Sequence, residues 1–405
     1  MPKKRVLVLF IHNHIGGAMT ALVNFVNALD PERYDVDLLF YEIRGDVEGI
    51  DPRVHILPQG KAGSHLGAKL RSPAYCAAFL RSLYYKRVKR NKLLRDQLLS
   101  RQGCRFSRPL DAHYDIAVSF ELCWPFYYMN RRVDADLKLV WHHNDYHSIG
   151  YRFNWDRRDF DRVDAQVFVS CQCMEKFVKL HPQYRGKCFF MPNIMAKAPI
   201  LARAEAEKVA LPFAPVRPGI TFVTVARMEF VTKGLDRMIP ILCRLREDGL
   251  IDRIRWLVIG GGRDAEAFDQ LIQKNNLHQV VFPIGMQENP LPYLKLADAF
   301  LLPSRNEGKP IVVTEAQILG LVPVVTNYTS ATEQIESGVD GLILENTDEE
   351  LYRGLKELLL HPERLEPLRN ALRQRSYTNE RDVSQFDAII EALHCAGQKE
   401  RGEQQ

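Results

Sequence analysis

The sequence predicts an α/β protein of two doubly wound domains, each built on a parallel sheet. Its 405 residues are too many for one ordinary core and suit two domains of about 200 residues each. Short apolar runs alternate with helical patterns, which is typical of β-α-β units. The alternation breaks at a stretch rich in Pro, Ala and charge, and then restarts. A composition of 46% hydrophobic and 26% charged residues is ordinary for a soluble globular protein and excludes disorder of the whole chain.

The first half begins with a basic start and a short apolar run. His12 and Asn13 end this run and no small-residue cleavage site follows, so we expect a first strand at Arg5–Ile11 rather than a signal peptide. A helix is expected at Ala18–Leu29. Further strands are expected at Val36–Tyr41, Ile116–Phe120, Leu137–Trp141, Ala165–Ser170 and Cys188–Met191.

The second half repeats the strand–helix alternation. Strands are expected at Thr221–Ala226, Arg255–Ile259, Val280–Pro283, Ala299–Pro303 and Val322–Thr326. Helices are expected at Leu235–Glu247, at Glu266–Asn275, from about Ile311 to Leu319, and in a tail from Glu349 onward.

These elements define the expected domains. We place an N-terminal domain at residues 1–195, a linker with a short helix at 196–218 and a C-terminal domain at 219–380. Residues 381–405 are expected to form a helix that crosses back to the first domain and ends in a frayed tail. Doubly wound sheets bind ligands at the carboxyl ends of their strands, so the site is expected in a central cleft that both domains face.

Positive charge is concentrated between residues 61 and 108, where 13 Lys and Arg face one acid, Asp96. Aromatic and basic residues interleave from Tyr75 to Arg90, which is typical of a basic amphipathic helix on an anionic membrane surface. A solvated helix face is the alternative. We expect no nucleic-acid partner, because no recognised binding module surrounds the segment.

The eight cysteines are scattered and form no C-x2-C pair. We interpret them as reduced thiols, which indicates a cytoplasmic protein. No stretch approaches the roughly 18 uncharged apolar residues that span a bilayer, so membrane contact would be peripheral, on the inner face of the cell membrane.

The strongest functional pattern follows the strand that ends at Pro303. A polar loop there contains Glu307, and Pro310 is expected to open a helix that contains Glu315. The N–H groups at such a helix start can bind an anion, and the two carboxylates can accept hydrogen bonds from sugar hydroxyls. Either glutamate alone is better explained as a dipole-complementing acid or a surface residue, but their joint placement favours a site. The donor-binding residues predicted here are Gly308, Lys309, Pro310, Ile311, Val312 and Glu315.

A second pattern lies on the loop that leaves the first strand of the second domain. Arg227 and Lys233 are six residues apart, and Gly234 follows. The two cations could bind a diphosphate leaving group, the arginine bidentately and the lysine as a point charge. Without the first pattern, a surface Arg and Lys would be the better explanation.

Glycine-rich turns give weaker signals. Gly16 and Gly17 join the first strand to its helix, either to admit a phosphate or sugar or to form a tight turn. Gly260 opens a G-x-G-x-x-A pattern, but the next strand lacks the acid that would hold a ribose, so NAD binding is not expected. We include Gly260 and Met286, which follow strands of the second domain, among the donor-binding residues.

Two histidines, His142 and His143, follow the end of a strand. Such a histidine could contact a substrate hydroxyl or shuttle a proton, and a buried structural histidine is an equal alternative. Two D-x-D sequences, at residues 35–37 and 134–136, lack a third ligand nearby, so we predict no metal ion and no cofactor.

Together these features resemble family 4 of the retaining glycosyltransferases, which have the GT-B fold of two Rossmann-like domains facing a central cleft. The resemblance covers roughly Lys4 to Leu393 and is strongest from Thr221 to Leu344. It rests on the E-x7-E pair Glu307 and Glu315, the R…KG element Arg227, Lys233 and Gly234, the Gly16-Gly17 loop, the histidine element Trp141–Asp145, and the segment Thr326–Leu344.

The resemblance implies a role for each residue of these motifs. Arg227 and Lys233 would neutralise the departing nucleoside diphosphate, and Glu315 would bind the ribose hydroxyls. Glu307 would hold the donor sugar, and His143 would contact this sugar from the opposite domain. The family retains anomeric configuration by same-face attack, so leaving-group electrostatics would dominate the barrier.

The expected function is transfer of a hexose from a nucleotide sugar, UDP-linked on grounds of prevalence, to a glycan or lipid-linked acceptor in cell-surface polysaccharide biosynthesis. Peripheral contact of residues 75–108 with an anionic membrane would suit a lipid-linked acceptor. Lys309 stands where the family often has an apolar residue, which indicates an unusual substrate or a solvent-facing side chain. The alternatives are a nucleotide-sugar epimerase and a catalytically silent partner subunit, against which the intact Glu307, Arg227 and Lys233 count.

Overall fold

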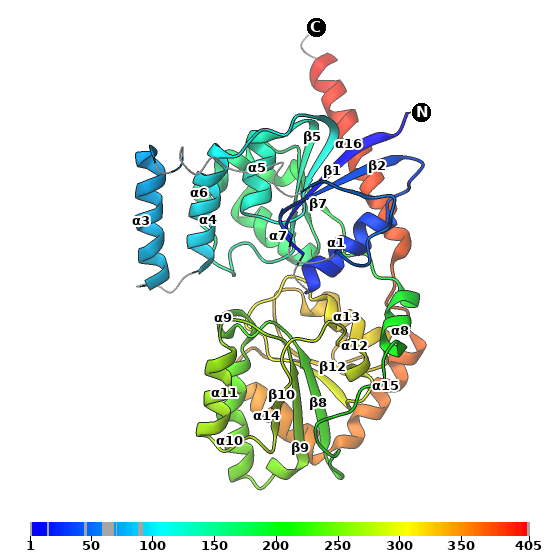
Figure 1. Cartoon of the computed structure of the whole chain (residues 1–405). Coiled ribbons are helices and arrows are strands. Elements are labelled where there is room, and N and C mark those ends of the chain that lie inside the picture. The colour runs from blue at the N-terminus through cyan, green and yellow to red at the C-terminus, as the bar shows by residue number, and fades with distance from the viewer. Residues whose placement is uncertain are drawn as a thin grey trace. The chain divides into compact units, whose positions relative to one another are not determined.

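The computed structural model describes residues 2–13, 16–43, 47–58, 69, 71–87 and 92–402. It divides into two compact units (Figure 1). Unit 1 comprises residues 1–194 and 381–405, and unit 2 comprises residues 195–380. Each unit has its own parallel sheet, which confirms the predicted α/β class of two doubly wound folds.

Unit 1 is built on a seven-stranded sheet in the order β3-β2-β1-β4-β5-β6-β7. All of its neighbouring strands pair in parallel, and β1 lies between β2 and β4, where the strand order reverses. Ligands bind at such a switch point, beyond the carboxyl ends of the strands. The strands are β1 (Lys4–His12), β2 (Tyr34–Glu42), β3 (His55–Ile56), β4 (His113–Ser119), β5 (Asp134–His142), β6 (Ala165–Phe168) and β7 (Cys188–Phe190).

The helices of unit 1 cover this sheet, and two of them extend the unit on one side (Figure 1). Helices α3 and α4 come from the basic segment and pack on each other, and Figure 1 shows α3 as the outer of the two. Residues 59–68, 70 and 88–91 of this region lie outside the described residues. The helices are α1 (Gly17–Ala28), α3 (Pro73–Arg87), α4 (Lys92–Gly103), α5 (Trp124–Arg132), α6 (Phe153–Phe160), α7 (Cys171–Leu180) and α16 (Ser384–Gly402).

Unit 2 repeats the same architecture on six parallel strands in the order β10-β9-β8-β11-β12-β13. Its switch point lies between β8 and β11. The strands are β8 (Ile220–Val225), β9 (Ile254–Ile259), β10 (Val281–Pro283), β11 (Ala299–Leu302), β12 (Val322–Thr326) and β13 (Leu342–Leu344). The helices are α8 (Lys197–Glu205), α9 (Phe230–Lys233), α10 (Met238–Glu247), α11 (Ala265–Lys274), α12 (Leu291–Leu294), α13 (Ile311–Ile318), α14 (Asp348–Leu360) and α15 (Leu365–Gln374).

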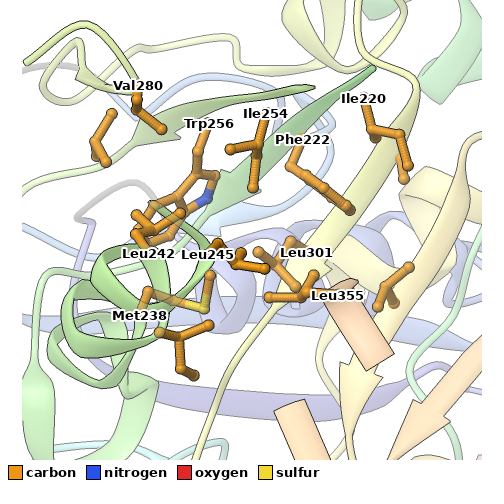
Figure 2. Close-up of a cluster of buried hydrophobic side chains, with 14 of the residues drawn as sticks. Ile220, Phe222, Met238, Leu242, Leu245, Ile254, Trp256, Val280, Leu301 and Leu355 are labelled. Carbon is orange, nitrogen blue, oxygen red and sulfur yellow. The ribbon is translucent and has the colours of Figure 1, made fainter. Parts of the chain in front are cut away.

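The core of unit 2 is centred on Trp256, which is fully buried on β9 (Figure 2). Leu242 of α10, Leu301 of β11 and Leu355 of α14 belong to the same cluster, so helices and sheet share one core. The indole N–H donates to the hydroxyl of Thr224 at 2.8 Å, which satisfies the one polar atom of the buried ring.

The structure corrects several predicted boundaries. Strands β3 and β13 were not predicted, because two or three residues carry no readable periodicity. The strand expected to reach Ser170 ends at Phe168, since Ser170 accepts a hydrogen bond from the amide of Cys173 and caps α7. The helix expected from Leu235 starts as a 3-10 turn, and α10 begins at Met238. Pro310 is extended and immediately precedes α13 rather than opening it.

None of the helices in the described ranges is long and apolar enough to span a bilayer. All eight cysteines are free thiols.

The C-terminal helix α16 packs into the core of unit 1 through Phe386, which is fully buried. Its ring lies 5.4 Å from that of Phe25 and 5.5 Å from that of Tyr34. Next to it, Asp387 accepts hydrogen bonds from Arg33 and Tyr34. The chain therefore completes the core of unit 1 only after unit 2 has been traversed.

We expect Phe386→Ala to lower the free energy of unfolding by about 3–5 kcal/mol, because it removes a fully buried ring and leaves a cavity. Urea titration followed by circular dichroism measures the change. Ala388→Ser, on the exposed side of α16, is the control and should change stability by less than about 0.5 kcal/mol. Equal stability of the two variants would show that α16 is not part of the core.

Candidate active site

The predicted donor-binding residues of unit 2 follow the carboxyl ends of adjacent strands. Arg227 follows β8, Gly260 follows β9, Met286 follows β10 and Glu307 follows β11. Because these strands are parallel neighbours, their following loops meet at one edge of the sheet. The sequence patterns, far apart in the chain, are therefore parts of one surface of unit 2.

The centre of this surface is a paired carboxylate. Glu307 is 5% exposed, and both of its oxygens accept hydrogen bonds from the ammonium group of Lys233, at 2.7 and 2.8 Å. The hydroxyl of Ser304 donates to the same carboxylate at 2.6 Å. The structure thus brings together the two motifs that carried the resemblance, and it adds Ser304, whose position three residues before Glu307 was the available signal.

Gly234 permits this pairing. Its φ of 66° lies in the left-handed region, and a Cβ atom there would be 2.3 Å from the carbonyl oxygen of Pro303. The backbone amide of Arg305 donates to the carbonyl of Thr232 at 2.8 Å. These contacts hold the loop of Lys233 against the loop of Glu307.

A second close approach positions Arg227. A Cβ atom at Gly260 would lie 1.9 Å from the carbonyl oxygen of Ala226, and one at Gly262 would lie 2.5 Å from that of Met228. The amide of Met228 donates to the carbonyl of Gly261 at 2.9 Å. Backbone packing against the loop of Arg227 therefore explains Gly260 and Gly262 without a dinucleotide.

The side chain of Arg227 is exposed at the tip of this loop, and within the described ranges it makes no ion pair. It differs in this respect from Lys233, whose charge is already matched by Glu307. Arg227 can therefore bind an anionic ligand without breaking an existing pair.

The start of α13 is tied to the segment that follows β12. The hydroxyl of Ser330 donates to the backbone carbonyl of Gly308. The side-chain amide of Gln334 donates from Nε2 to the backbone carbonyl of Pro310 at 3.1 Å. In a trans peptide the N–H points opposite to the C=O, so the N–H group of Ile311 points away from Gln334. This orientation lets the first backbone donor of α13 face an anion at the helix start.

Lys309, the departure from the family pattern, is only 19% exposed and lies 3.6 Å from the carboxylate of Glu333. This ion pair adds a third link between the start of α13 and the segment after β12. The sequence did not predict Glu333 as its partner, because the two residues lie on loops after different strands.

Glu315 lies on α13 and is 7% exposed. Burial raises the pKa of its carboxyl to about 7, and the charge of Arg203 opposes this effect only in part. A buried carboxylate of this kind is stabilised strongly by ligand hydroxyls that donate hydrogen bonds to it.

In unit 1 the two neighbouring histidines have different environments. His142 is buried against the ring of Phe168 at 4.2 Å, and its Nε2 lies 3.1 Å from Oε1 of Gln166. The ring of His143 lies 4.7 Å from that of Phe120, and its buried Nε2 has no hydrogen-bond partner among the described residues. Burial lowers the pKa of His143 to about 4, so the ring is neutral at pH 7. Nδ1 of His142 is likewise buried without a partner among the described residues, so an unsatisfied nitrogen does not by itself distinguish the two rings. His143 is the less buried of the two, and its Nε2 is the nitrogen that a ligand hydroxyl could satisfy.

The glycine turn of unit 1 leaves space at the carboxyl end of β1. Gly17 is the first residue of α1, and a Cβ atom at Gly16 would meet no atom within 4 Å. Close packing inside unit 1 therefore does not account for the glycine at position 16.

Both D-x-D sequences lie near the amino ends of their strands, and acids of each have partners within unit 1. Asp37 accepts from the hydroxyl of Tyr114 at 2.6 Å and lies 2.9 Å from His55, and Asp134 lies 3.0 Å from His113. Across the described ranges, no three His, Cys, Asp or Glu side chains are placed to hold a metal ion.

Comparison with known proteins identifies the class. The two doubly wound units match, at a TM-score of 0.62 and 11% identity, a variant of S. aureus TarM in complex with fondaparinux, alpha-GlcNAc-glycerol and UDP, over 96% of this chain and 98% of TarM. The protein therefore has the GT-B glycosyltransferase fold. Residues 215–378, which form most of unit 2, match the family model "Glycosyl transferases group 1". This match over unit 2 confirms the glycosyltransferase resemblance predicted from the motifs.

Two curated relatives extend the comparison. EpsF of Bacillus subtilis is 25% identical over 359 residues, which are 84% of this chain and 83% of EpsF. The UDP-Gal:alpha-D-GlcNAc-diphosphoundecaprenol alpha-1,3-galactosyltransferase of Escherichia coli is 29% identical over 103 residues, which are 27% of this chain and 28% of the enzyme.

We expect Glu315→Gln to stabilise the free protein at pH 8 by about 3 kcal/mol and to leave its stability at pH 5 nearly unchanged. Because the folded-state pKa of about 7 lies above the ordinary 4.5, the folded protein binds this proton more tightly, and stability falls as pH rises between these values. Thermal unfolding at the two pH values measures the difference.

Glu247→Gln, on the exposed end of α10, is the control for loss of a carboxylate and should show no such pH-dependent gain. A Glu315→Gln variant that melts at the wild-type temperature at pH 8 would contradict the buried ionised carboxyl.

Proposed function

We propose that the protein transfers a hexose from a nucleotide sugar, with UDP as the nucleotide, to a glycan or lipid-linked acceptor in cell-surface polysaccharide biosynthesis. The observation that carries this proposal is the Lys233–Glu307 ion pair, which lies at the edge of the sheet that also carries Arg227 and the start of α13. The E. coli relative is named for a UDP-linked donor and a diphosphoundecaprenol-linked acceptor, and the TarM structure contains UDP. Both support the choice of donor, and the relative supports a lipid-linked acceptor.

The leaving group is the first chemical problem that the site addresses. Breaking the bond between the anomeric carbon and the phosphate oxygen places negative charge on the nucleoside diphosphate. We assign its neutralisation to Arg227, Lys233 and the backbone donor at the start of α13. Lys233 and the start of α13 are held by hydrogen bonds before the reaction, which reduces the cost of reorganisation. A metal ion is not required in this scheme, because cations and helix dipole supply the charge.

The remaining residues orient the substrates. We assign Glu315 to the ribose hydroxyls, Glu307 to the hydroxyls of the donor sugar and the neutral His143 to a substrate hydroxyl. We further propose retention of configuration: the acceptor hydroxyl attacks the anomeric carbon on the face that the leaving group departs from, and its proton passes to the departing phosphate oxygen. Glu307 then needs to bind rather than to attack, which fits a carboxylate already held by Lys233 and Ser304.

A panel of UDP, GDP, ADP and NADH in a thermal-shift assay, each with and without EDTA, tests the donor class. We expect UDP to raise the melting temperature by several degrees in both conditions, since a ligand at 100 times its dissociation constant stabilises by about 2.7 kcal/mol. A shift with NADH alone would overturn the proposal. Stability unchanged by every nucleotide would favour a silent partner subunit.

We expect Arg227→Ala to lower kcat/KM by roughly two orders of magnitude, about 3 kcal/mol of transition-state stabilisation, because it removes a charge aimed at the leaving group. Release of UDP from UDP-hexose with acceptor present measures the rate. Arg353→Gln, an exposed arginine of α14, controls for loss of a positive charge and should retain the wild-type rate. A loss below twofold in the Arg227 variant would remove this residue from the mechanism.

We also propose that α3 contacts an anionic membrane. Phe79, Leu80 and Tyr84 expose between 47% and 67% of their surface beside the exposed cations Arg81, Lys86 and Arg87. An apolar and basic surface of this kind binds anionic bilayers through both burial and charge.

We expect the protein to cosediment with vesicles of phosphatidylcholine and phosphatidylglycerol, but only weakly with phosphatidylcholine alone. Added NaCl should reduce binding, because salt shortens the range of the attraction to about 8 Å at physiological ionic strength. Leu80→Ser should weaken binding at every salt concentration. Binding that depends on neither the lipid charge nor the salt concentration would contradict this part of the proposal.

A further inference from the structure

Two arginines of unit 1 converge on one indole ring. Arg81 lies on α3 and Arg152 immediately precedes α6. Their guanidinium carbons are 5.7 and 5.2 Å from the centre of the Trp155 ring. Arg152 is also 5.8 Å from the ring centre of Tyr85, whose ring meets that of Trp155 edge-on at 6.2 Å. Two positive charges from separate elements therefore share one aromatic platform.

Neither charge is neutralised by the protein. Both arginines are exposed, and in the part of the chain that the structure describes neither guanidinium pairs with an acid. Asp96 is paired with Arg95 at 2.7 Å, and Asp156 is turned into the unit. Cation–π attraction holds each guanidinium at the ring but does not satisfy its forked N–H donors. Two unpaired positive charges on one ring attract an anion.

The backbone beneath this cluster is fixed. The amide of Arg152 donates to Oε1 of Gln97 at 3.1 Å, and Nε2 of Gln97 donates to the carbonyl of Arg152 at 3.1 Å. Gln97 is fully buried and also donates to Asp156 at 2.8 Å. Trp155 packs against the apolar cluster that joins α3 to α4. An anion would meet a platform that is ordered before it binds, which reduces the entropy cost of binding.

The neighbourhood of the cluster indicates what carries the anion. Leu80 and Tyr84, next to Arg81 and Tyr85 on the same helix, are 67% and 47% exposed. A phosphate group attached to an apolar chain would satisfy the arginines and cover these side chains together.

We propose that Arg81, Arg152 and Trp155 form a phosphate-binding site of unit 1 that takes the phosphate or diphosphate group of a lipid. The inference deepens the proposed membrane contact and lipid-linked acceptor, and it rests on them. Each guanidinium can bind two phosphate oxygens in parallel, and the indole ring sets the separation of the two forks. The site belongs to unit 1, whereas the residues assigned to the nucleotide belong to unit 2.

Trp155 supplies the readout. Of the four tryptophans, Trp124, Trp141 and Trp256 are buried and Trp155 is partly exposed. We expect inorganic pyrophosphate and phosphatidylglycerol vesicles each to change the tryptophan emission, and Trp155→Phe to abolish the change. The pyrophosphate titration is repeated in Arg227→Ala, because pyrophosphate can also occupy the proposed donor site.

Matched variants separate a site from diffuse charge. Arg81→Gln and Arg152→Gln should each weaken binding of both probes about tenfold, the equivalent of about 1.4 kcal/mol. Arg87→Gln removes an exposed charge from the same helix without touching Trp155 and should weaken binding less than about twofold. Vesicles in which oleate replaces phosphatidylglycerol at equal charge should bind more weakly than the phospholipid vesicles.

Equal losses in all three arginine variants, or equal binding of oleate and phosphatidylglycerol vesicles, would overturn the phosphate site in favour of diffuse attraction. An emission change with pyrophosphate but not with vesicles would overturn the lipid as its source and leave a site for soluble phosphate. If UDP raises the melting temperature of the wild-type protein but neither probe changes the emission of Trp155, this inference is refuted and the donor proposal still holds.

Discussion

The burial of one carboxylate constrains much of unit 2. Glu307 is 5% exposed, and an ionised carboxylate in such a position costs several kcal/mol unless it is paired and hydrogen-bonded. Lys233 and Ser304 supply that pairing, so the loops after β8 and β11 must approach within hydrogen-bond distance. Only a residue without a side chain fits at position 234, because the carbonyl oxygen of Pro303 occupies the space of a Cβ atom. The R…KG and E-x7-E patterns are thus linked, because Lys233 of the first must pair with Glu307 of the second.

The same pairing explains how the site tolerates its charges without a ligand. Lys233 is matched by Glu307 and Lys309 by Glu333, which leaves Arg227 as an exposed cation at the edge of the described site. A diphosphate would add negative charge near the unpaired Arg227 and near Lys233, which is already held by a carboxylate. Glu315 is the exception, since burial disfavours its ionised form and no cation pairs with it in the described chain. Stability is reduced at a position where ligand binding gains from a poised acceptor, which is the usual trade-off at functional sites.

The sequence predicted the strands well because buried parallel strands are continuous apolar runs, and it placed their ends within a few residues. It could not predict β3 or β13, which are too short to show a period. Site residues were predictable where local spacing carried the chemistry, as for Glu307 and Glu315. They were not predictable where the partner is distant in the chain, as for Lys309 with Glu333. His142 and His143 are identical letters in adjacent positions, and only the opposite orientation of alternate strand residues separates the fully buried ring from the half-buried one.

The basic segment shows most clearly why composition alone does not define a surface. All 13 cations lie in one segment of the sequence, but the structure uses them differently. The carbonyls of Arg101, Cys104 and Arg105, at the end of α4 and just beyond it, accept hydrogen bonds from Arg131 and Arg132 of α5, so that end of the segment is occupied by contacts inside unit 1. Favourable contacts of this kind offset the negative end of the α4 dipole. On α3, by contrast, Arg81, Lys86 and Arg87 are exposed beside apolar side chains, and only α3 combines cations with large exposed apolar side chains among the described helices of the segment. An anionic partner is therefore better matched to α3 than to the segment as a whole, and within α3 to the turn where Arg81 and a second arginine contact one aromatic ring.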